Sequence, residues 1–253
     1  MITLFRRIRQ KLIASGSITK YLLYALGEIL LVVIGILIAL QINNWNNDRI
    51  ERGLELKLLT QIQSDLLTTA ESITDLQSKL EVSVSSADSL LQSFREKEEV
   101  KSFVFNASLI HRRFFFNPAS SGYSQLGGSL GTVIRNDSLR NQIVDLYEGD
   151  FEEIGKRQEM LTGHLNQNVV PQSSKLFDLN RRISFRMSDF DENSMDIYTP
   201  INFETLASDG EYANTIVILK RLYSIQLNQL RVSLNQIEGT VAVIEDEIDQ
   251  FNN

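Results

Sequence analysis

The feature that most constrains this chain is an apolar run near its N-terminus, Tyr21–Ile42. It reads YLLYALGEILLVVIGILIALQI and contains one formally charged residue, Glu28. As a helix the run would extend about 33 Å, which matches the ~30 Å hydrocarbon core of a bilayer. The uncharged stretch Ile29–Leu40 would extend only about 18 Å, so a span has to carry Glu28 into the membrane. We therefore predict one transmembrane helix over residues 20–42.

Tyr21 and Tyr24 lie at the start of the run, and Trp45 lies just after its end. Aromatic residues in these positions are typical of anchors at the membrane–water interfaces. Two other interpretations of the run stay open. A helix buried in a protein core is disfavoured because no side of the run is polar. A cleaved signal peptide would have a shorter apolar stretch of about 7–15 residues and a small-x-small cleavage pattern, which Ala39–Asn43 lacks. We favour an uncleaved signal anchor.

Charge is distributed unevenly along the sequence. The chain has 25 basic and 32 acidic residues, and its net charge of −7 argues against nucleic-acid binding. The first 20 residues hold five basic residues and no acidic one, which leaves the remainder with 20 basic and 32 acidic residues, a net charge of −12. The five basic residues are Arg6, Arg7, Arg9, Lys11 and Lys20.

This asymmetry predicts an orientation for the span. The positive-inside rule places the N-terminal residues in the cytoplasm and the bulk of the chain, after Asn43, on the far side of the membrane. Residues 1–19 also carry apolar side chains at helical spacing. We expect them to form a basic amphipathic segment that lies on the anionic inner leaflet.

Glu28 is the most informative single residue of the predicted span. A carboxylate inside a membrane is unfavourable unless it is protonated, paired or hydrated. Gly35 follows seven residues later and Ala39 four further on, so the three share one side of a helix, and small residues at this spacing let a second helix approach closely. We interpret this side as a helix-contact face, within a homo-oligomer or with another membrane protein. The alternative is a neutral Glu28 near the inner boundary with no contact role.

Two parts of the sequence resemble a known family. They are Gly27–Ile29 with Val32–Asn46, and Tyr123–Leu126 with Val133–Arg140 and Ile143–Tyr147. They are similar to the N-terminal signature and the middle region of a family of uncharacterised single-span membrane proteins from Bacteroidetes-type bacteria, catalogued as a domain of unknown function. The resemblance covers the whole chain and implies one bacterial inner-membrane span with a helical domain in the periplasm. It implies no activity, cofactor or catalytic residue. The chain departs from the family pattern with its glycine-rich stretch Gly127–Gly131.

Two long apolar seams lie on either side of the middle of the chain, and their residues recur in steps of three and four, as in a coiled coil. The first comprises Leu54, Leu58, Ile62, Leu66, Ile73, Leu76, Leu80, Val84, Leu91 and Phe94, and the second comprises Ile216, Leu219, Tyr223, Leu227, Leu230, Leu234, Ile237, Val241, Ile244, Ile248 and Phe251. Each would form a helix of about 60 Å. We predict a stalk helix over 43–99 and an antiparallel returning helix over 210–253. The alternative is that each pairs with another copy or another protein.

Residues 100–209 are expected to form a helical head. Its predicted parts are a helix over Ser102–Phe116, a helix from Asp137 through Leu161 and a polar loop over Ser188–Pro200. We expect the three phenylalanines at 114–116 to pack in its core. No segment alternates as a strand over any length. The predicted fold class is therefore nearly all-α, with one transmembrane helix continuing into a long antiparallel helical coiled coil and a distal helical head.

The sequence offers little chemistry for catalysis. It has no cysteine and two histidines, His111 and His164, which excludes disulfides, thiolate chemistry and a three-histidine metal site within one chain. The stretch Asp189–Asn193 resembles the start of a calcium loop, but Ser194 and Pro200 stand where glycine and a bidentate acid are needed. We predict no catalytic, cofactor-binding or metal-binding residue.

These observations favour a non-enzymatic helical scaffold or interaction protein anchored in the inner membrane. Its expected partners are the lipid bilayer and, through the transmembrane helix, a second copy or another membrane protein. The alternative is a periplasmic small-molecule sensor domain that signals through a membrane partner, because helical bundles of this size can hold small ligands.

Overall fold

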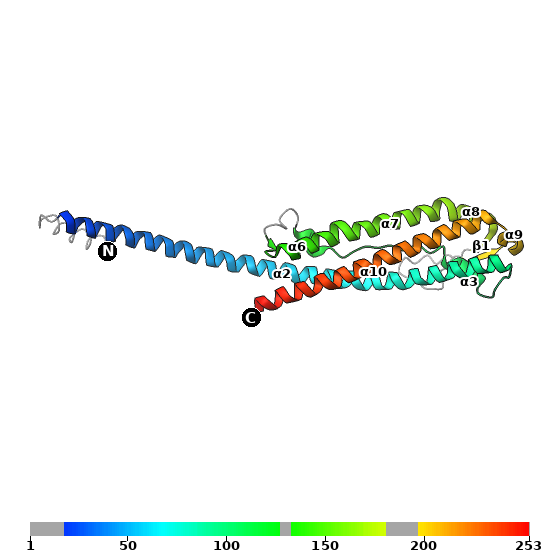
Figure 1. The fold of residues 1–253 in the computed structure, drawn as a ribbon, viewed down its shortest axis with the longest axis horizontal. Coiled ribbons are helices and arrows are strands. Elements are labelled where there is room, and N and C mark those ends of the chain that lie inside the picture. Colours follow the sequence, from blue (N-terminus) through cyan, green and yellow to red (C-terminus); the bar gives the residue numbers. More distant parts are fainter. Residues whose placement is uncertain (1–17, 127–132, 181–196, 253) are drawn as a thin grey trace. The chain divides into compact units, whose positions relative to one another are not determined.

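The computed structural model of the protein describes residues 18–126, 133–180 and 197–252. These described residues are 85% helical. The chain divides into two compact units, Met1–Glu55 (unit 1) and Leu56–Asn253 (unit 2). The described elements, in chain order, are α2 (Ile18–Glu96), α3 (Phe103–Leu109), α4 (Ser121–Leu126), α6 (Asp137–Val144), η2 (Asp145–Asp150), α7 (Phe151–His164), η3 (Leu165–Val169), α8 (Val170–Leu176), β1 (Phe177–Asn180), β2 (Ile197–Pro200), α9 (Phe203–Ala207) and α10 (Gly210–Asn252) (Figure 1). The nearly all-α class is confirmed.

In unit 1, the described residues belong to the first part of α2. Between Leu22 and Ile42 the large apolar side chains on every side of this helix are 44–68% exposed. Exposure continues through Trp45, Ile50 and Leu54. Within the described residues, these side chains are therefore left largely uncovered.

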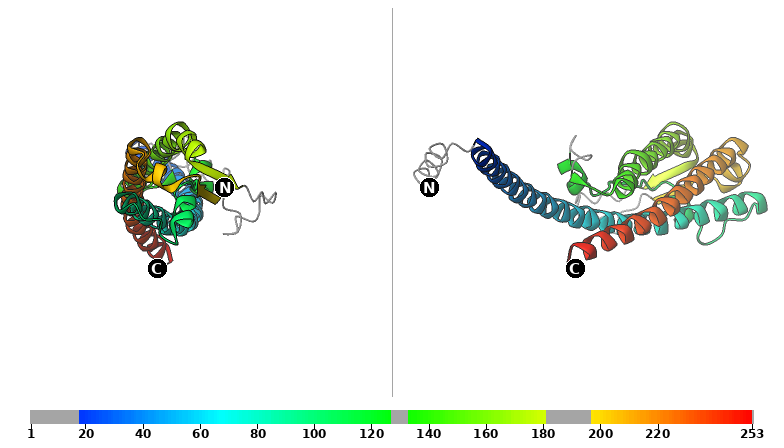
Figure 2. Two further views of the ribbon diagram at one scale, coloured as in Figure 1. Left: turned by 90° about the vertical axis from the view of Figure 1, so that its right-hand side faces the viewer. Right: turned by 60° about the vertical axis from the view of Figure 1, so that its left-hand side comes forward.

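In unit 2, the second part of α2 packs antiparallel against α10, so the predicted pairing of the two long helices within one chain is confirmed (Figure 2). Side chains bridge the two helices in antiparallel register. The bridging pairs are Gln63 with Glu245 at 3.0 Å, Glu81 with Arg231 at 2.7 Å and Asp88 with Lys220 at 2.5 Å. The sequence seams meet here: Ile62, Leu66 and Ile73 on α2 and Ile216, Leu219 and Tyr223 on α10 are fully buried.

A third long helical stretch runs without interruption from Asp137 to Leu176, through α6, η2, α7, η3 and α8. The segments η2 and η3 are π-helical, with wider turns than an α-helix. The segment η3 ends two residues before Pro171, which has no N–H to donate to the preceding turn, so the wide turn lies where the regular hydrogen-bond ladder is interrupted. Asn136 begins the stretch as its N-cap and accepts from the Leu139 N–H at 3.1 Å.

Two local predictions were wrong. The helix predicted over Ser102–Phe116 ends at Leu109, and residues 112–120 are not helical. Backbone groups there bind side chains instead: the Ile110 carbonyl accepts from Tyr223 at 2.7 Å, and the Phe116 N–H donates to Gln158 at 2.7 Å. In this irregular backbone the three phenylalanines do not share one side, since Phe114 is buried while Phe115 is 70% exposed.

The second wrong prediction concerns the polar loop over Ser188–Pro200. Its last four residues form β2, which pairs antiparallel with β1 in the register Phe177 to Pro200 and Asn180 to Ile197. Tyr198 explains the strand, because its ring is 6% exposed and packs edge-on to Phe177 at 5.8 Å. A β-prone aromatic residue with a buried site overrides the polar sequence around it.

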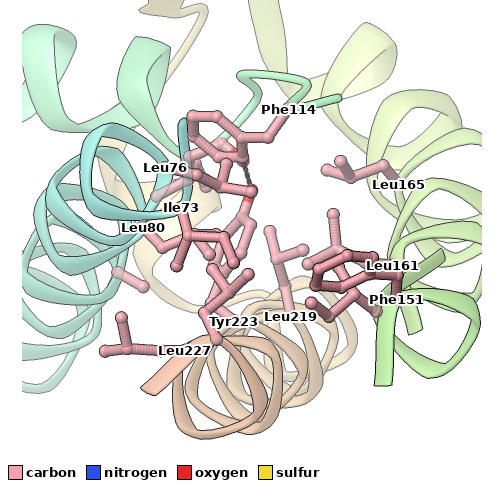
Figure 3. Close-up of a cluster of buried hydrophobic side chains, with 14 of the residues drawn as sticks. Ile73, Leu76, Leu80, Phe114, Phe151, Leu161, Leu165, Leu219, Tyr223 and Leu227 are labelled. Carbon is pink, nitrogen blue, oxygen red and sulfur yellow. Dashed lines mark hydrogen bonds between the residues drawn. The ribbon is translucent and has the colours of Figure 1, made fainter. Parts of the chain in front are cut away.

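The core of unit 2 lies where its three long helical stretches meet. Ile73, Leu76 and Leu80 enter it from α2, Phe151 and Leu161 from α7, and Leu219, Tyr223 and Leu227 from α10, with Phe114 above them (Figure 3). Buried apolar area of this kind contributes about 25 cal/mol per Å². Apart from Leu54, which is 57% exposed, the apolar seams predicted from sequence thus contribute to one core.

Candidate functional site

The predicted helix-contact face lies within unit 1, on α2. At about 100° of rotation per residue, Glu28, Gly35 and Ala39 fall within roughly 40° of one another around the helix axis. Glu28 is half-buried and Ala39 is exposed. A Cβ atom placed on Gly35 would meet nothing within 4 Å. The helix therefore brings the three predicted residues to one side, with space over the glycine for a neighbouring backbone.

The predicted membrane anchors are only partly described. Trp45 is 66% exposed on α2. Tyr21, Tyr24 and Lys20 belong to α2, but their side chains lie outside the described part of the structure. The other inner-leaflet residues, Arg6, Arg7, Arg9 and Lys11, lie outside the described residues altogether.

Unit 2 contains a buried carboxylate that the sequence analysis missed. Asp65 on α2 is 6% exposed and accepts hydrogen bonds from the Gly122 N–H at 2.6 Å, Ser121 Oγ at 2.8 Å and Gln61 Nε2 at 3.2 Å. It thus binds the first residues of α4. Because an ionised carboxylate is an acceptor with several lone pairs, three donors compensate for much of its lost hydration.

The same contact fixes how closely α4 approaches α2. A Cβ atom on Gly122 would lie 2.9 Å from both Ile62 Cγ1 and the Ile62 backbone nitrogen. Only glycine fits without a shift of one backbone against the other. Nearby, the Ala119 N–H donates to Thr69 Oγ1 at 3.0 Å, and Tyr147 donates to the Ala119 carbonyl at 3.1 Å. These bonds fasten the irregular segment between α2 and α7, so Asp65 has a structural role.

A second polar group, the His111 cluster, consists of His111, Ser173, Tyr198 and Tyr212. His111 Nδ1 lies 2.6 Å from the Ala107 carbonyl oxygen, and Nε2 lies 2.8 Å from Ser173 Oγ. The Ser173 hydroxyl lies 3.3 Å from the Tyr212 hydroxyl. The His111 ring stacks on Tyr198 with ring centroids 3.7 Å apart and planes at 11°. Residues from four separate segments therefore meet at one imidazole.

A hydroxyl bonded to an imidazole is also the arrangement of a nucleophile and its base. In this cluster Ser173 is 0% exposed and Tyr212 is 0% exposed. A substrate cannot reach a hydroxyl that the chain encloses, so the pair ties segments together. Sequence inspection could not find it, because Ser173 and His111 are 62 residues apart and neither stands in a recognisable motif.

Within residues 18–126, 133–180 and 197–252, no group of three or more His, Asp or Glu side chains is placed to hold a metal ion. The stretch Asp189–Asn193, with its resemblance to a calcium loop, lies outside these residues. In the described part of the chain, one helix is long and apolar enough to cross a membrane, and its most apolar 18-residue window has a mean hydropathy of 2.5 with no part buried.

A family model described as a family of unknown function, DUF6090, matches residues 28–206. The chain belongs to this family. No curated protein and no solved structure matches it. The DUF6090 match includes both stretches that carried the sequence resemblance, except Gly27, so the resemblance to a family of unknown function is confirmed. The match covers residues 28–206 and not the whole chain as expected. The match begins at Glu28, inside the apolar segment, and ends in α9.

Proposed function

We propose that this DUF6090 protein is a non-enzymatic helical scaffold, anchored in a bacterial inner membrane by residues 20–42 of α2. The observation that carries the proposal is the apolar window of α2, with its mean hydropathy of 2.5 and no buried part. Exposure of such a surface to water is unfavourable, whereas its exposure to lipid hydrocarbon is not. A helix also satisfies its own backbone hydrogen bonds inside a membrane.

Two features support a permanent anchor rather than a cleaved signal sequence. The helix α2 is continuous from Ile18 to Glu96, so cleavage after the apolar segment would sever it within regular hydrogen bonding. The family match covers residues 28–206 and therefore includes most of the apolar segment together with unit 2 as far as α9. A signal peptide that is cleaved from the mature protein would not be expected to lie inside the region that the family model matches.

The orientation follows from charge. Five basic residues and no acidic one precede Tyr21, which favours a cytoplasmic N-terminus and a periplasmic unit 2. The basic residues would then face anionic lipid headgroups, each attracted by about 1 kcal/mol. Tyr21, Tyr24 and Trp45 would lie at the two membrane–water interfaces.

The span is proposed to assemble with another helix through Glu28, Gly35 and Ala39. Association inside a membrane depends on close packing and on polar contacts, since lipid is as apolar as leucine. Gly35 and Ala39 permit close packing, and Glu28 supplies a polar group that prefers a protein partner to lipid. The partner is a second copy or another membrane protein.

The polar residues of unit 2 support interaction rather than catalysis. Asp65 and the His111 cluster are turned inward and fasten elements to one another. A binding scaffold needs a rigid domain on an anchor, and these contacts provide rigidity. A sensor would instead need an enclosed ligand, which is an outcome of the experiment below.

The test is cross-linking of the full chain in cells, followed by purification in mild detergent and identification of what copurifies. We expect a cross-linked homo-oligomer or a defined membrane partner. Gly35→Leu should abolish that product because its side chain fills the contact face, whereas Gly27→Leu, about 100° around the helix from Glu28, should retain it. Glu28→Gln separates charge from packing. A monomer with a bound metabolite would overturn the scaffold and favour the sensor.

A further inference from the structure

The helix α10 carries a second row of apolar side chains beside those that are buried in the core. Ile218, Ile225 and Val232 recur at intervals of seven residues and are 50%, 37% and 43% exposed. Val217, next to the first of them, is 50% exposed. A spacing of seven residues returns to nearly the same side of a helix, since 3.6 residues make one turn. These four residues therefore form one apolar stripe on α10, the outer row.

The contacts that α10 makes with its neighbours lie on other sides of the helix. Two salt bridges join it to α2, Lys220–Asp88 and Arg231–Glu81. Gln226 donates to the Ile154 carbonyl of α7 at 3.3 Å. Around the helix axis, Ile225 is about 100° from Gln226 and about 120° from Arg231. The outer row thus faces away from both α2 and α7.

The outer row lies in an acid-free part of an acidic protein. Between Val217 and Gln236 the sequence has no acidic residue, whereas Glu238–Asp249 has five. The residues after Lys20 together have a net charge of −12, so two copies of unit 2 repel each other wherever their acidic surfaces meet. The outer row is a surface at which two copies can approach without that repulsion.

The residue types at the row favour a parallel pair of identical helices. Side chains branched at Cβ, spaced by seven residues, are the preference of one core position in parallel two-stranded coiled coils. A two-fold axis along α10 would place Ile218, Ile225 and Val232 each against its own counterpart. Asn228 and Asn235 are exposed next to the row, and an asparagine can pair with its own copy across such an axis. Arg221 is exposed there too, and its long side chain can extend into water.

We propose that the outer row of α10 is a contact surface for a second copy of this chain, with the two α10 helices parallel and side by side. This contact presupposes the membrane anchor proposed above, and it specifies that the partner of the scaffold is a second copy. Chains inserted in the same orientation are compatible with parallel α10 helices.

The size of the row explains why the contact needs the anchor. A stable interface between free proteins buries about 800 Å² on each partner, and four half-exposed aliphatic side chains cover much less. A shared tether raises the effective concentration of the second site to the millimolar range. Under these conditions a weak contact is sufficient, and copies without the anchor should not pair through it.

The experiment is oxidative cross-linking of single-cysteine variants of the full chain in the membranes of the expressing cells. The chain has no cysteine, so each introduced thiol reports one position. Ile225→Cys should form a disulfide-linked dimer. Ser85→Cys, at an exposed position of α2, is the control for random collision and should stay monomeric. Failure of Ile225→Cys to exceed this control would overturn the proposal.

Two differently tagged variants, Ile218→Cys and Val232→Cys, test the direction of the pairing when they are produced together. In a parallel pair each links to its own kind, because the two positions are about 21 Å apart along the helix. A mixed disulfide between the two tags would mean that the helices are antiparallel and would overturn the proposal.

A charged variant tests the row without relying on a thiol at its centre. Ile225→Arg in the Ile218→Cys chain should abolish the cross-linked dimer, because it brings two cations together at the middle of the contact. Val82→Arg, at a 44% exposed apolar position of α2, is the matched control and should retain the dimer. Both variants should keep the melting temperature of the unaltered chain, since neither side chain is buried. A dimer that survives Ile225→Arg would contradict the proposed contact.

Ala39→Cys, in the first part of α2, reports contact of the spans separately. Dimers of Ala39→Cys without dimers of Ile225→Cys would overturn the outer-row contact and leave the proposed anchor and its assembly in place. Dimers of Ile225→Cys alone would support the outer row and reject pairing of copies through Glu28, Gly35 and Ala39. A disulfide from Ile225→Cys to a different protein, or no dimer at either position, would overturn the second copy as the partner.

Discussion

The first and second parts of α2 differ in apolar content and in surroundings: 18 of the 22 residues of Tyr21–Ile42 are apolar, against 16 of the 41 residues of Leu56–Glu96. From Leu22 to Ile42 the large apolar side chains are 44–68% exposed. In unit 2, by contrast, Leu59, Ile62 and Leu66 are 0–1% exposed. The two parts differ in the pattern of their apolar residues. In the first part these residues occur on all sides of the helix, whereas in the second they form one stripe between polar faces.

Under the proposed anchoring, the two parts of this helix would have different solvents. A stripe is covered by other helices of the chain, and the remaining faces are hydrated. A helix that is apolar all round needs an apolar solvent on all sides. The predictions below test whether the two parts respond differently to the same kind of substitution.

The largest effect is expected from charge in the first part. Val33→Arg combined with Leu37→Arg places two cations at the centre of the span, each unfavourable by about 3 kcal/mol. The protein should move from the carbonate-washed membrane fraction to the soluble or degraded fraction. Val82→Arg, at a 44% exposed apolar position of α2 in unit 2, should remain in the membrane fraction. Equal loss from the membrane fraction in both variants would show that the two parts of α2 do not differ in their need for a membrane.

Truncation of one leucine in each part should have its larger effect in the second part of α2. Leu66→Ala leaves a cavity in the core of unit 2 and should lower its free energy of unfolding by about 2–5 kcal/mol. Leu37→Ala, from a side chain that is 58% exposed, should lower it by less than about 0.5 kcal/mol. Urea unfolding of both variants in detergent, followed by circular dichroism, measures the difference. A large loss for Leu37→Ala would mean that unit 2 buries the first part of α2.

Two glycines, one in unit 2 and one in the first part of α2, provide a finer test. Gly122→Ala forces a Cβ atom against the Ile62 backbone and should reduce the stability of unit 2 by about 1–3 kcal/mol. Gly35→Ala has open space around it and should leave that stability unchanged. Thermal unfolding of the two variants is sufficient. If Gly122→Ala is neutral, α4 does not approach α2 as closely as the structure places it.

The smallest effect is expected at the surface of unit 2. Arg231 and Glu81 join α10 and α2 at 2.7 Å, but their side chains are 59% and 54% exposed. Solvent screens such pairs, so Arg231→Ala should change the free energy of unfolding by no more than about 1 kcal/mol. A loss comparable to that of Leu66→Ala would show that charge, rather than the apolar seam, holds the two helices together.

The sequence was sufficient to predict the long elements. Steps of three and four from Ile62 to Phe94 and from Ile216 to Ile244 identify the two paired helices, because each long helix in water must bury one apolar stripe. The antiparallel pairing within one chain followed from their matched lengths. The resemblance at Gly27–Asn46 predicted a family of unknown function, and such a family matches residues 28–206.

The sequence was not sufficient for the middle of the chain. The end of α3 depends on Tyr223 and Gln158, which bind its following backbone from other helices. The strand β2 depends on a site for Tyr198 beside His111. Asp65 and Ser173 receive their roles from residues more than 50 positions away. Such contacts join residues that are far apart in the sequence and follow no regular spacing, so no pattern within a short stretch of sequence predicts them.

The central claim is that the first part of α2 spans a membrane and places unit 2 outside the cytoplasm. Since the chain has no cysteine, one introduced thiol reports its own location. In intact cells, a membrane-impermeant maleimide should label Ser85→Cys, an exposed position of unit 2, and should label Ser15→Cys only after lysis. Labelling of Ser15→Cys in intact cells, with Ser85→Cys protected until lysis, would contradict the account.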